Sequence, residues 1–282
     1  MSVLHHGADA MGYAPCYYED IGVPFRGPKR DLNGAYIACL GGAGMFGKFI
    51  PQALPDLLEL GVGLPAVNLA QVNGGVDFMS NPDIIAIAQR AECAVVDLVG
   101  AHNLSNRFYK VHPRRNDRVV SGTSVLREVF PSLDLSDVHF TRHLLTQMQD
   151  TSPRRTETVI EELQHCWLEK MQAFLSQMSG PVILLWMGGV AVPERAGDPS
   201  SRLPFVDFRM VTEIAQSVSD LIVIDGQDLH ASCTELKLPE RYKPQAKLLP
   251  SAQEIAVAAN QVIHRITRQG FVGAPRSDLR AG

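Results

Sequence analysis

The chain has 282 residues and a net charge of -4, and this acidic balance argues against a dedicated nucleic-acid binder, which is more often basic. A hydrophobic content of 45% with 20% charged residues is that of an ordinary globular protein, and the length allows one α/β domain with a sizeable core. No apolar run reaches the length of a membrane span, so we expect no membrane-spanning segment. Because the net charge is negative, we do not expect nucleic acid among its partners.

The cysteines are five in number and scattered, without a CxxC pair. This pattern favours reduced, buried thiols and a cytoplasmic location. His139 and His143 stand four residues apart on a predicted helix but have no third ligand, so we predict no metal site. We also predict no cofactor, and the sequence leaves the oligomeric state open.

In chain order, residues 1–33 are irregular and are predicted to form an arm that packs on the domain. Residues 34–268 are predicted to be a single α/β domain, and residues 269–282 a loose tail. Helices are expected from the glycine loop to about Leu60, from Asn81-Pro82 to Arg90, through 121–149, from Ser152-Pro153 onward, and after the capping box Ser251–Glu254.

Five apolar runs of strand length alternate with these helices, at about 34–40, 64–70, 94–99, 182–186 and 221–224. The alternation predicts a parallel sheet with helices on both faces, a three-layer, flavodoxin-like α/β fold. The stretch from Gly100 to Arg118 is expected to be a long polar loop.

The first strand enters a loop with four glycines, Gly41-Gly42-Ala43-Gly44 and Gly47. Glycine lets the backbone approach a ligand closely, and ligands of α/β sheets bind at the carboxyl ends of the strands. We therefore place Gly42, Ala43 and Gly44 among the candidate ligand-binding residues.

The loops after the first three strands resemble the motif blocks of the SGNH (GDSL-type) hydrolase superfamily. Val67–Gly75 is similar to its second block, which carries a glycine oxyanion donor, and Gly100–Asn103 to its third, Gly-x-x-Asn. The resemblance implies an SGNH-like fold with Asn103 and Gly74 as oxyanion donors, His102 as a further catalytic candidate and Asn73 beside the ligand. The run Asn103–Arg118 is similar to a mainly alphaproteobacterial group of SGNH-like proteins, a likeness that implies the fold but no reaction.

Two elements of the superfamily pattern are not matched. Its Gly-Asp-Ser nucleophile block corresponds here to Gly41-Gly42-Ala43, and alanine cannot act as a nucleophile. Its last block, Asp-x-x-His, is absent at Ala246–Pro250, while Asp225, Asp228 and His230 have the wrong spacing to replace it. Whether Ala43 is native or an engineered inactivation is left open.

The glycine loop also fits a degenerate phosphate-binding pattern, Gly42-x-x-x-x-Gly47-Lys48, in which Phe49 stands where a magnesium-binding Ser or Thr is required. A sulfate or phosphate donor bound without magnesium would tolerate this change.

Cations are concentrated in the third loop. Arginine forks suit phosphate, sulfate or carboxylate, and Asp117 is the one acid among them. The candidate anion ligands are Arg107, His112, Arg114, Arg115 and Arg118, with Lys110 between them. A structural role, in which these arginines pair with acids such as Asp97, Asp134 or Asp137, is the alternative.

Three functions follow from these patterns. The first is a divergent SGNH-like enzyme, a transferase or hydrolase that acts on a small anionic or saccharide ligand without the usual serine. The second is a non-catalytic binding protein for an anionic saccharide, nucleotide or lipid head group. The third is a sulfo- or phosphoryl transferase that uses the glycine loop 41–48.

Overall fold

The computed structural model describes residues 13–18, 21–195, 199–226 and 238–271. Its centre is a five-stranded sheet in the order β4-β3-β5-β8-β9, with every neighbouring pair parallel. The strands are β3 (Ile37–Leu40), β4 (Ala66–Asn68), β5 (Cys93–Asp97), β8 (Val182–Trp186) and β9 (Asp220–Val223). The predicted α/β sheet is confirmed, and its order is the doubly wound, flavodoxin-like one.

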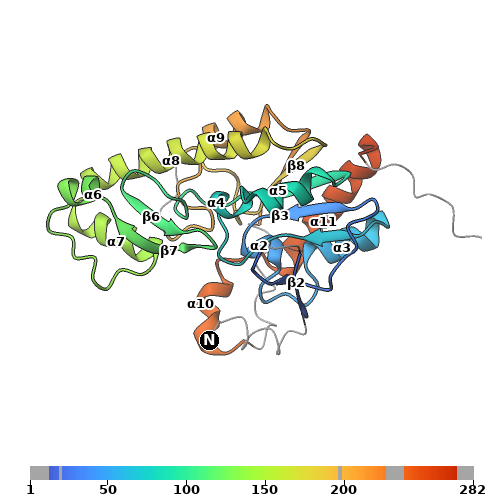
Figure 1. The fold of residues 1–282 in the computed structure, drawn as a ribbon, viewed down its shortest axis with the longest axis horizontal. Helices are drawn as coiled ribbons and strands as arrows, with labels where there is room; N and C mark the ends of the chain where they lie inside the picture. Colours follow the sequence, from blue (N-terminus) through green and yellow to red (C-terminus); the bar gives the residue numbers. More distant parts are fainter. Residues whose placement is uncertain (1–12, 19–20, 196–198, 227–237, 272–282) are drawn as a thin grey trace, which may run out of the picture.

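Two cores lie on the two faces of the sheet because successive side chains of a strand point to opposite faces. On β3, Ile37 and Cys39 belong to one core and Ala38 and Leu40 to the other. The first core is covered by α3 (Leu54–Val62) and α11 (Ala252–Gln269). The second is covered by α4 (Val76–Met79), α5 (Pro82–Gln89), α8 (Pro153–Leu175) and α9 (Phe208–Ala215). Figure 1 shows α8 and α9 along one side of the molecule and α3 and α11 toward the other.

Two helix starts follow the capping chemistry that the sequence predicts, whereas Ser152 at the start of α8 makes no side-chain capping hydrogen bond. Asn81 accepts a hydrogen bond from the Asp83 amide at the start of α5, and Ser251 and Glu254 form the capping box of α11. The apolar stripe of α8 is core, with Leu163, Trp167 and Met171 buried.

Two expectations for local structure were wrong. The helix after the glycine loop is not continuous to Leu60. It is broken into α2 (Ala43–Phe46) and α3, because Gly47 and Phe49 adopt positive φ angles of 73° and 67° between them. The expected polar loop at 100–118 contains the hairpin β6 (Tyr109–His112) and β7 (Arg115–Gly122) instead, since alternate residues of β6, Tyr109 and Val111, are buried on the core.

Because β7 extends to Gly122, the region predicted as helix through 121–149 begins as strand. Its helices are α6 (Ser124–Val129) and α7 (Thr141–Thr151). Figure 1 shows the hairpin, α6 and α7 grouped at one end of the molecule, away from α3.

The N-terminal segment is tied to the domain by Arg26, which is 5% exposed. It lies in β2 (Phe25–Arg26), which pairs with β1 (Pro15–Cys16). Its guanidinium donates to the carbonyl oxygens of Gly47, Ile50 and Pro51 at 2.6, 2.9 and 2.6 Å and lies 3.7 Å from an Asp56 oxygen. Burial lowers the Arg26 pKa, and the Asp56 charge opposes that shift. These bonds hold the end of the loop formed by residues 41–48, which we call the glycine turn. Residues 1–12 and 272–282 lie outside the described residues, and the proposed domain limits stay a prediction.

Candidate functional site

The loops after β3, β4 and β5 meet at the carboxyl edge of the sheet. A Cβ atom added to Gly42 would lie 3.3 Å from Val99 Cγ1 and 3.7 Å from the Gly74 oxygen. One added to Gly75 would lie 2.4 Å from the Asn103 oxygen, so a larger residue cannot fit there without moving the backbone. The meeting point lies at the switch between β3 and β5, where doubly wound sheets bind ligands.

Ala43 is the first residue of α2 and is partly exposed. The N–H groups of residues 45–48 are already bonded. Met45 donates to Asp97 Oδ2 at 3.2 Å, and Phe46, Gly47 and Lys48 donate to carbonyl oxygens of the same turn. A phosphate loop needs such N–H groups to face the ligand, so this geometry gives the phosphate-loop interpretation no support.

The two predicted oxyanion donors differ. The Gly74 N–H donates to the Gln71 oxygen at 2.9 Å and is therefore occupied within its own turn. Asn103 accepts a hydrogen bond from Thr141 Oγ1 at 2.6 Å through Oδ1, which leaves its amide hydrogens directed away from Thr141. Asn103 thus keeps the donor that an oxyanion needs, whereas Gly74 does not.

His102 is buried, and its Nδ1 has no hydrogen-bond partner among the described residues. Burial, with a smaller contribution from the Arg142 charge, holds its pKa well below the ordinary value, so the ring is neutral at pH 7. Its carbonyl oxygen accepts from the Tyr109 hydroxyl at 2.7 Å.

Asn116 is fully buried and joins the hairpin to the loop after β4. Its Oδ1 accepts from the Gly75 and Phe78 amides at 2.7 and 3.1 Å, and its Nδ2 donates to the His112 and Pro113 oxygens at 3.0 and 3.3 Å. The Asn116 amide also donates to the Asn73 oxygen at 3.0 Å. Sequence reasoning missed this residue because a neutral side chain inside a basic run gives no signal of its own.

The cationic run divides into two groups. Arg107 pairs with Glu162 on α8 at 3.1 Å, and Arg118 lies 4.2 Å above the Phe140 ring, so both have structural contacts. Lys110, His112, Arg114 and Arg115 are exposed, and Arg114 donates to the Gly22 oxygen at 3.0 Å. We call these four residues the hairpin tip.

The hairpin and the glycine turn also interact electrostatically, through Asp117 and Lys48. Burial raises the pKa of Asp117, against the charges of Arg115, Arg118 and Lys48. Burial lowers the pKa of Lys48, and Asp117 opposes that shift. Lys48 follows the glycine turn and donates to Gln245 Oε1 at 3.0 Å, in α10 (Lys243–Ala246). Asp117 and the glycine turn are therefore electrostatic neighbours.

A buried group of charged residues, Asp97, Arg202 and Glu254, lies beneath the same edge of the sheet. Arg202 and Glu254 form a two-bond ion pair at 2.6 and 3.3 Å, and the Glu254 side chain is 0% exposed. Burial raises the Glu254 pKa, but hydrogen bonds from Arg202 and Ser251 outweigh it and leave the pKa lowered. Burial raises the pKa of Asp97, at the end of β5, to about 8, and the Met45 amide and Arg202 offset only part of that. The capping box predicted Glu254 as a helix cap; nothing in the sequence linked it to Arg202.

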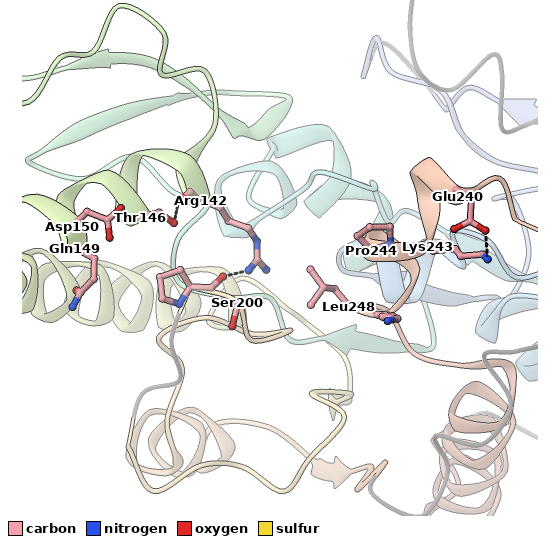
Figure 2. Close-up of a pocket in the computed structure, with 11 residues that line it drawn as sticks. Arg142, Thr146, Gln149, Asp150, Ser200, Glu240, Lys243, Pro244 and Leu248 are labelled. Carbon is pink, nitrogen blue, oxygen red and sulfur yellow. Dashed lines mark hydrogen bonds and ion pairs between the residues drawn. The ribbon is translucent and has the colours of Figure 1, made fainter.

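Two cavities among the described residues are lined by none of the predicted site residues. A groove of about 1050 Å³ lies between α7 and the segment formed by η2 (Glu240–Tyr242) and α10, with Arg142 and Leu248 extending into it (Figure 2). A second cavity of about 490 Å³ lies beside the Lys170–Asp77 ion pair. Among the described residues no group of three or more His, Cys, Asp or Glu could hold a metal ion, and no helix is long and apolar enough to cross a membrane. Asp228 and His230 lie outside the described residues.

Solved structures with a similar fold include carbohydrate esterases. A carbohydrate esterase family 2 enzyme of Corynascus thermopiles (Myceliophthora fergusii) is 10% identical, with a TM-score of 0.40, over 86% of this chain and 68% of that one. An acetyl xylan esterase of Butyrivibrio proteoclasticus is 9% identical, with a TM-score of 0.40, over 89% and 68%. A putative SGNH hydrolase of Slackia heliotrinireducens is 14% identical, with a TM-score of 0.34, over 82% and 98%.

No curated protein matches the sequence. A family model matches residues 1–270, and the chain therefore belongs to the family described as "Domain of unknown function (DUF6473)".

Proposed function

We propose that this protein binds an anionic ligand, such as an anionic saccharide, between the hairpin tip and the glycine turn. The site has alanine at position 43, in place of a serine nucleophile. The observation that carries the proposal is the anchorage of the hairpin. Asn116 fixes the turn of the hairpin to Gly75 with a buried hydrogen bond of 2.7 Å, so the exposed cations stand at the carboxyl edge of the sheet on a rigid support. Cations that need not be ordered on binding lose less conformational entropy.

A structural role is favoured for Arg107, which pairs with Glu162, and for Arg118, which lies above the Phe140 ring. Lys110 and Arg115 are exposed and form no ion pair within the described residues. A guanidinium in such a position keeps donors free for phosphate, sulfate or carboxylate.

The test is binding of sulfate, inorganic phosphate and glucose 6-phosphate, measured by thermal melting and by calorimetry. Arg115→Ala should weaken binding about 10- to 150-fold, the loss expected for a charge-assisted hydrogen bond of about 1.5–3 kcal/mol. Arg107→Ala is the matched control from the same run and should not change affinity. Failure of the wild-type protein to bind any of the three anions, or equal losses in both variants, would refute the proposal.

A second candidate is an enzyme that uses a route without the usual serine, and Asn103 favours it. Its amide remains able to donate to a developing negative charge. Ala43→Ser tests whether the rest of an acyl-transfer site is present. A burst of product from an activated ester would mean that the oxyanion donors are intact and that only the nucleophile was lost, whereas an inactive variant would agree with the occupied Gly74 N–H and favour binding alone.

A further inference from the structure

The cavity beside the Lys170–Asp77 ion pair lies where α4, α8 and the hairpin strand β6 meet. Figure 1 shows α4 and β6 on the same side of α8. The volume of the cavity, about 490 Å³, is within the range of small-molecule sites. No residue of the hairpin tip or the glycine turn lines it, so it is separate from the proposed anion site.

The two charges in this cavity compensate each other. Lys170 Nζ donates to Asp77 Oδ1, and the Ser105 amide donates to Asp77 Oδ2 at 2.9 Å, so both carboxylate oxygens already have a donor. No other charged residue among those that the structure describes lines the cavity. A charged ligand would lose hydration here without meeting an uncompensated opposite charge. The cavity therefore favours an uncharged ligand.

The polar groups that remain free in the cavity include donors as well as acceptors. Ser80 Oγ makes no hydrogen bond within the part of the chain that the structure describes. Ser105 Oγ accepts from the Val111 amide at 3.1 Å, which leaves its own hydrogen able to donate. Lys170 keeps two N–H donors, and Gln177 Oε1 is an unused acceptor among the described residues. Hydroxyl groups match this mixture because each can both donate and accept.

The rest of the lining is apolar and interrupted. Pro113 and Ala173 are exposed, whereas Val111 and Phe174 are buried. The Phe174 side chain is 0% exposed, so it offers no ring face on which a nucleobase could stack. The apolar residues alternate with polar ones, which leaves no continuous surface for an acyl chain. A small ring with apolar faces and a rim of hydroxyl groups fits both parts of the lining.

We propose that this cavity binds one uncharged pyranose sugar. Its C–H face packs on Pro113 and Ala173, and its hydroxyl groups bond to Ser80, Ser105 and Gln177. The inference is independent of the proposed anion site, because a compensated ion pair and free hydroxyl groups select the ligand here, whereas exposed cations select it there.

Calorimetry and ligand-observed NMR on the full chain test the proposal with four uncharged probes: methyl glucopyranoside, methyl galactopyranoside, cyclohexanol and N-acetylglycinamide. At least one of the two glycosides should bind, and cyclohexanol should not, because it has a ring of the same size but only one hydroxyl group. The affinity for the glycoside should not change between about 0.05 and 0.5 M salt, since no net charge is involved. Binding of neither glycoside, or tighter binding of N-acetylglycinamide, would overturn the proposal.

Two variants locate the bound sugar. Ala173→Trp places a large side chain at the cavity and should abolish binding, whereas Glu161→Trp, at an exposed position of α8 outside the cavity, is the matched control and should bind as wild type does. Wild-type affinity in Ala173→Trp would overturn the assignment to this cavity.

Ser80→Ala tests the hydroxyl contact without disturbing the fold, because the Ser80 hydroxyl makes no hydrogen bond to the described residues. It should weaken glycoside binding about 2- to 10-fold, the loss of one neutral hydrogen bond, and leave the melting temperature of the unliganded protein unchanged. Unchanged affinity in this variant would contradict the proposed contact. Arg115→Ala should leave glycoside binding intact, which distinguishes this cavity from the hairpin site.

Discussion

Two charged regions lie at the carboxyl edge of the sheet, and they differ in burial. The Arg202–Glu254 pair is enclosed, with side-chain exposures of 9% and 0%, and both carboxylate oxygens are bonded. The hairpin tip is exposed, and its cations make few contacts with the rest of the chain. Buried charges must be compensated internally, whereas exposed charges are solvated and remain available to a ligand. We therefore expect the first region to contribute to stability, and the second is where we propose that a ligand binds.

The largest effect is expected at the buried pair. Glu254→Ala should lower the free energy of unfolding by about 3–5 kcal/mol, because the Arg202 charge would remain buried without its partner. Denaturant unfolding measures the change. Glu213→Ala, which removes an exposed pair with Arg209, is the control and should stay within about 0.5 kcal/mol of wild type. Equal losses in both variants would contradict the contrast between the regions.

Asn116 should rank next because it is buried but neutral. Asn116→Ala leaves the Gly75 amide without its acceptor, at a cost of about 1–3 kcal/mol, whereas the Phe78 amide keeps its second acceptor, the Gly75 oxygen at 3.2 Å. Anion binding at the hairpin tip should fall as well, since the tip loses its anchor. Asn33→Ala removes an exposed asparagine with only local bonds to Asp31 and serves as the control. Normal stability in Asn116→Ala would show that the hairpin is held by other contacts.

Asp97 gives a pH-dependent test of the buried region. Its folded pKa, about 8, lies above the ordinary value of 3.8, so the folded state binds more protons between these limits. The contribution of Asp97 is therefore fully present below about pH 4 and is lost as the pH rises toward and through about 8. Asp97→Asn removes this loss and should be more stable than wild type at pH 9, by an amount on the order of a few kcal/mol. Melting curves from pH 4 to 9 whose difference stays constant would refute the assignment.

The smallest change in stability is expected at the hairpin tip. Arg114→Ala and Arg115→Ala should each alter the free energy of unfolding by no more than about 0.5 kcal/mol, because both side chains are exposed. Thermal melting without ligand measures this. A large loss in either variant would show that the tip is structural, and the contrast with the buried pair would fail.

The sequence by itself determined the sheet and much of the capping. Local periodicity predicts the strands, because apolar runs of strand length depend only on neighbours in the chain. The same is true of two capping motifs, Asn81 before Pro82 and the Ser251–Glu254 box. Alternating burial made the hairpin harder to predict, since polar residues such as Lys110 and His112 occupy every second position of β6 and hide the strand in a basic run.

The tertiary structure alone decided which polar groups meet. Arg202 and Glu254 are 52 residues apart, and Asn116 is 41 residues from Gly75. The sequence contains no local mark of such pairs, because their geometry depends on how the chain returns to one sheet edge. The same holds for the Gly74 N–H, which the motif predicted as a free donor and which the turn occupies with the Gln71 oxygen. A motif fixes residue types, but the hydrogen bonds left free depend on the packing of every element around them.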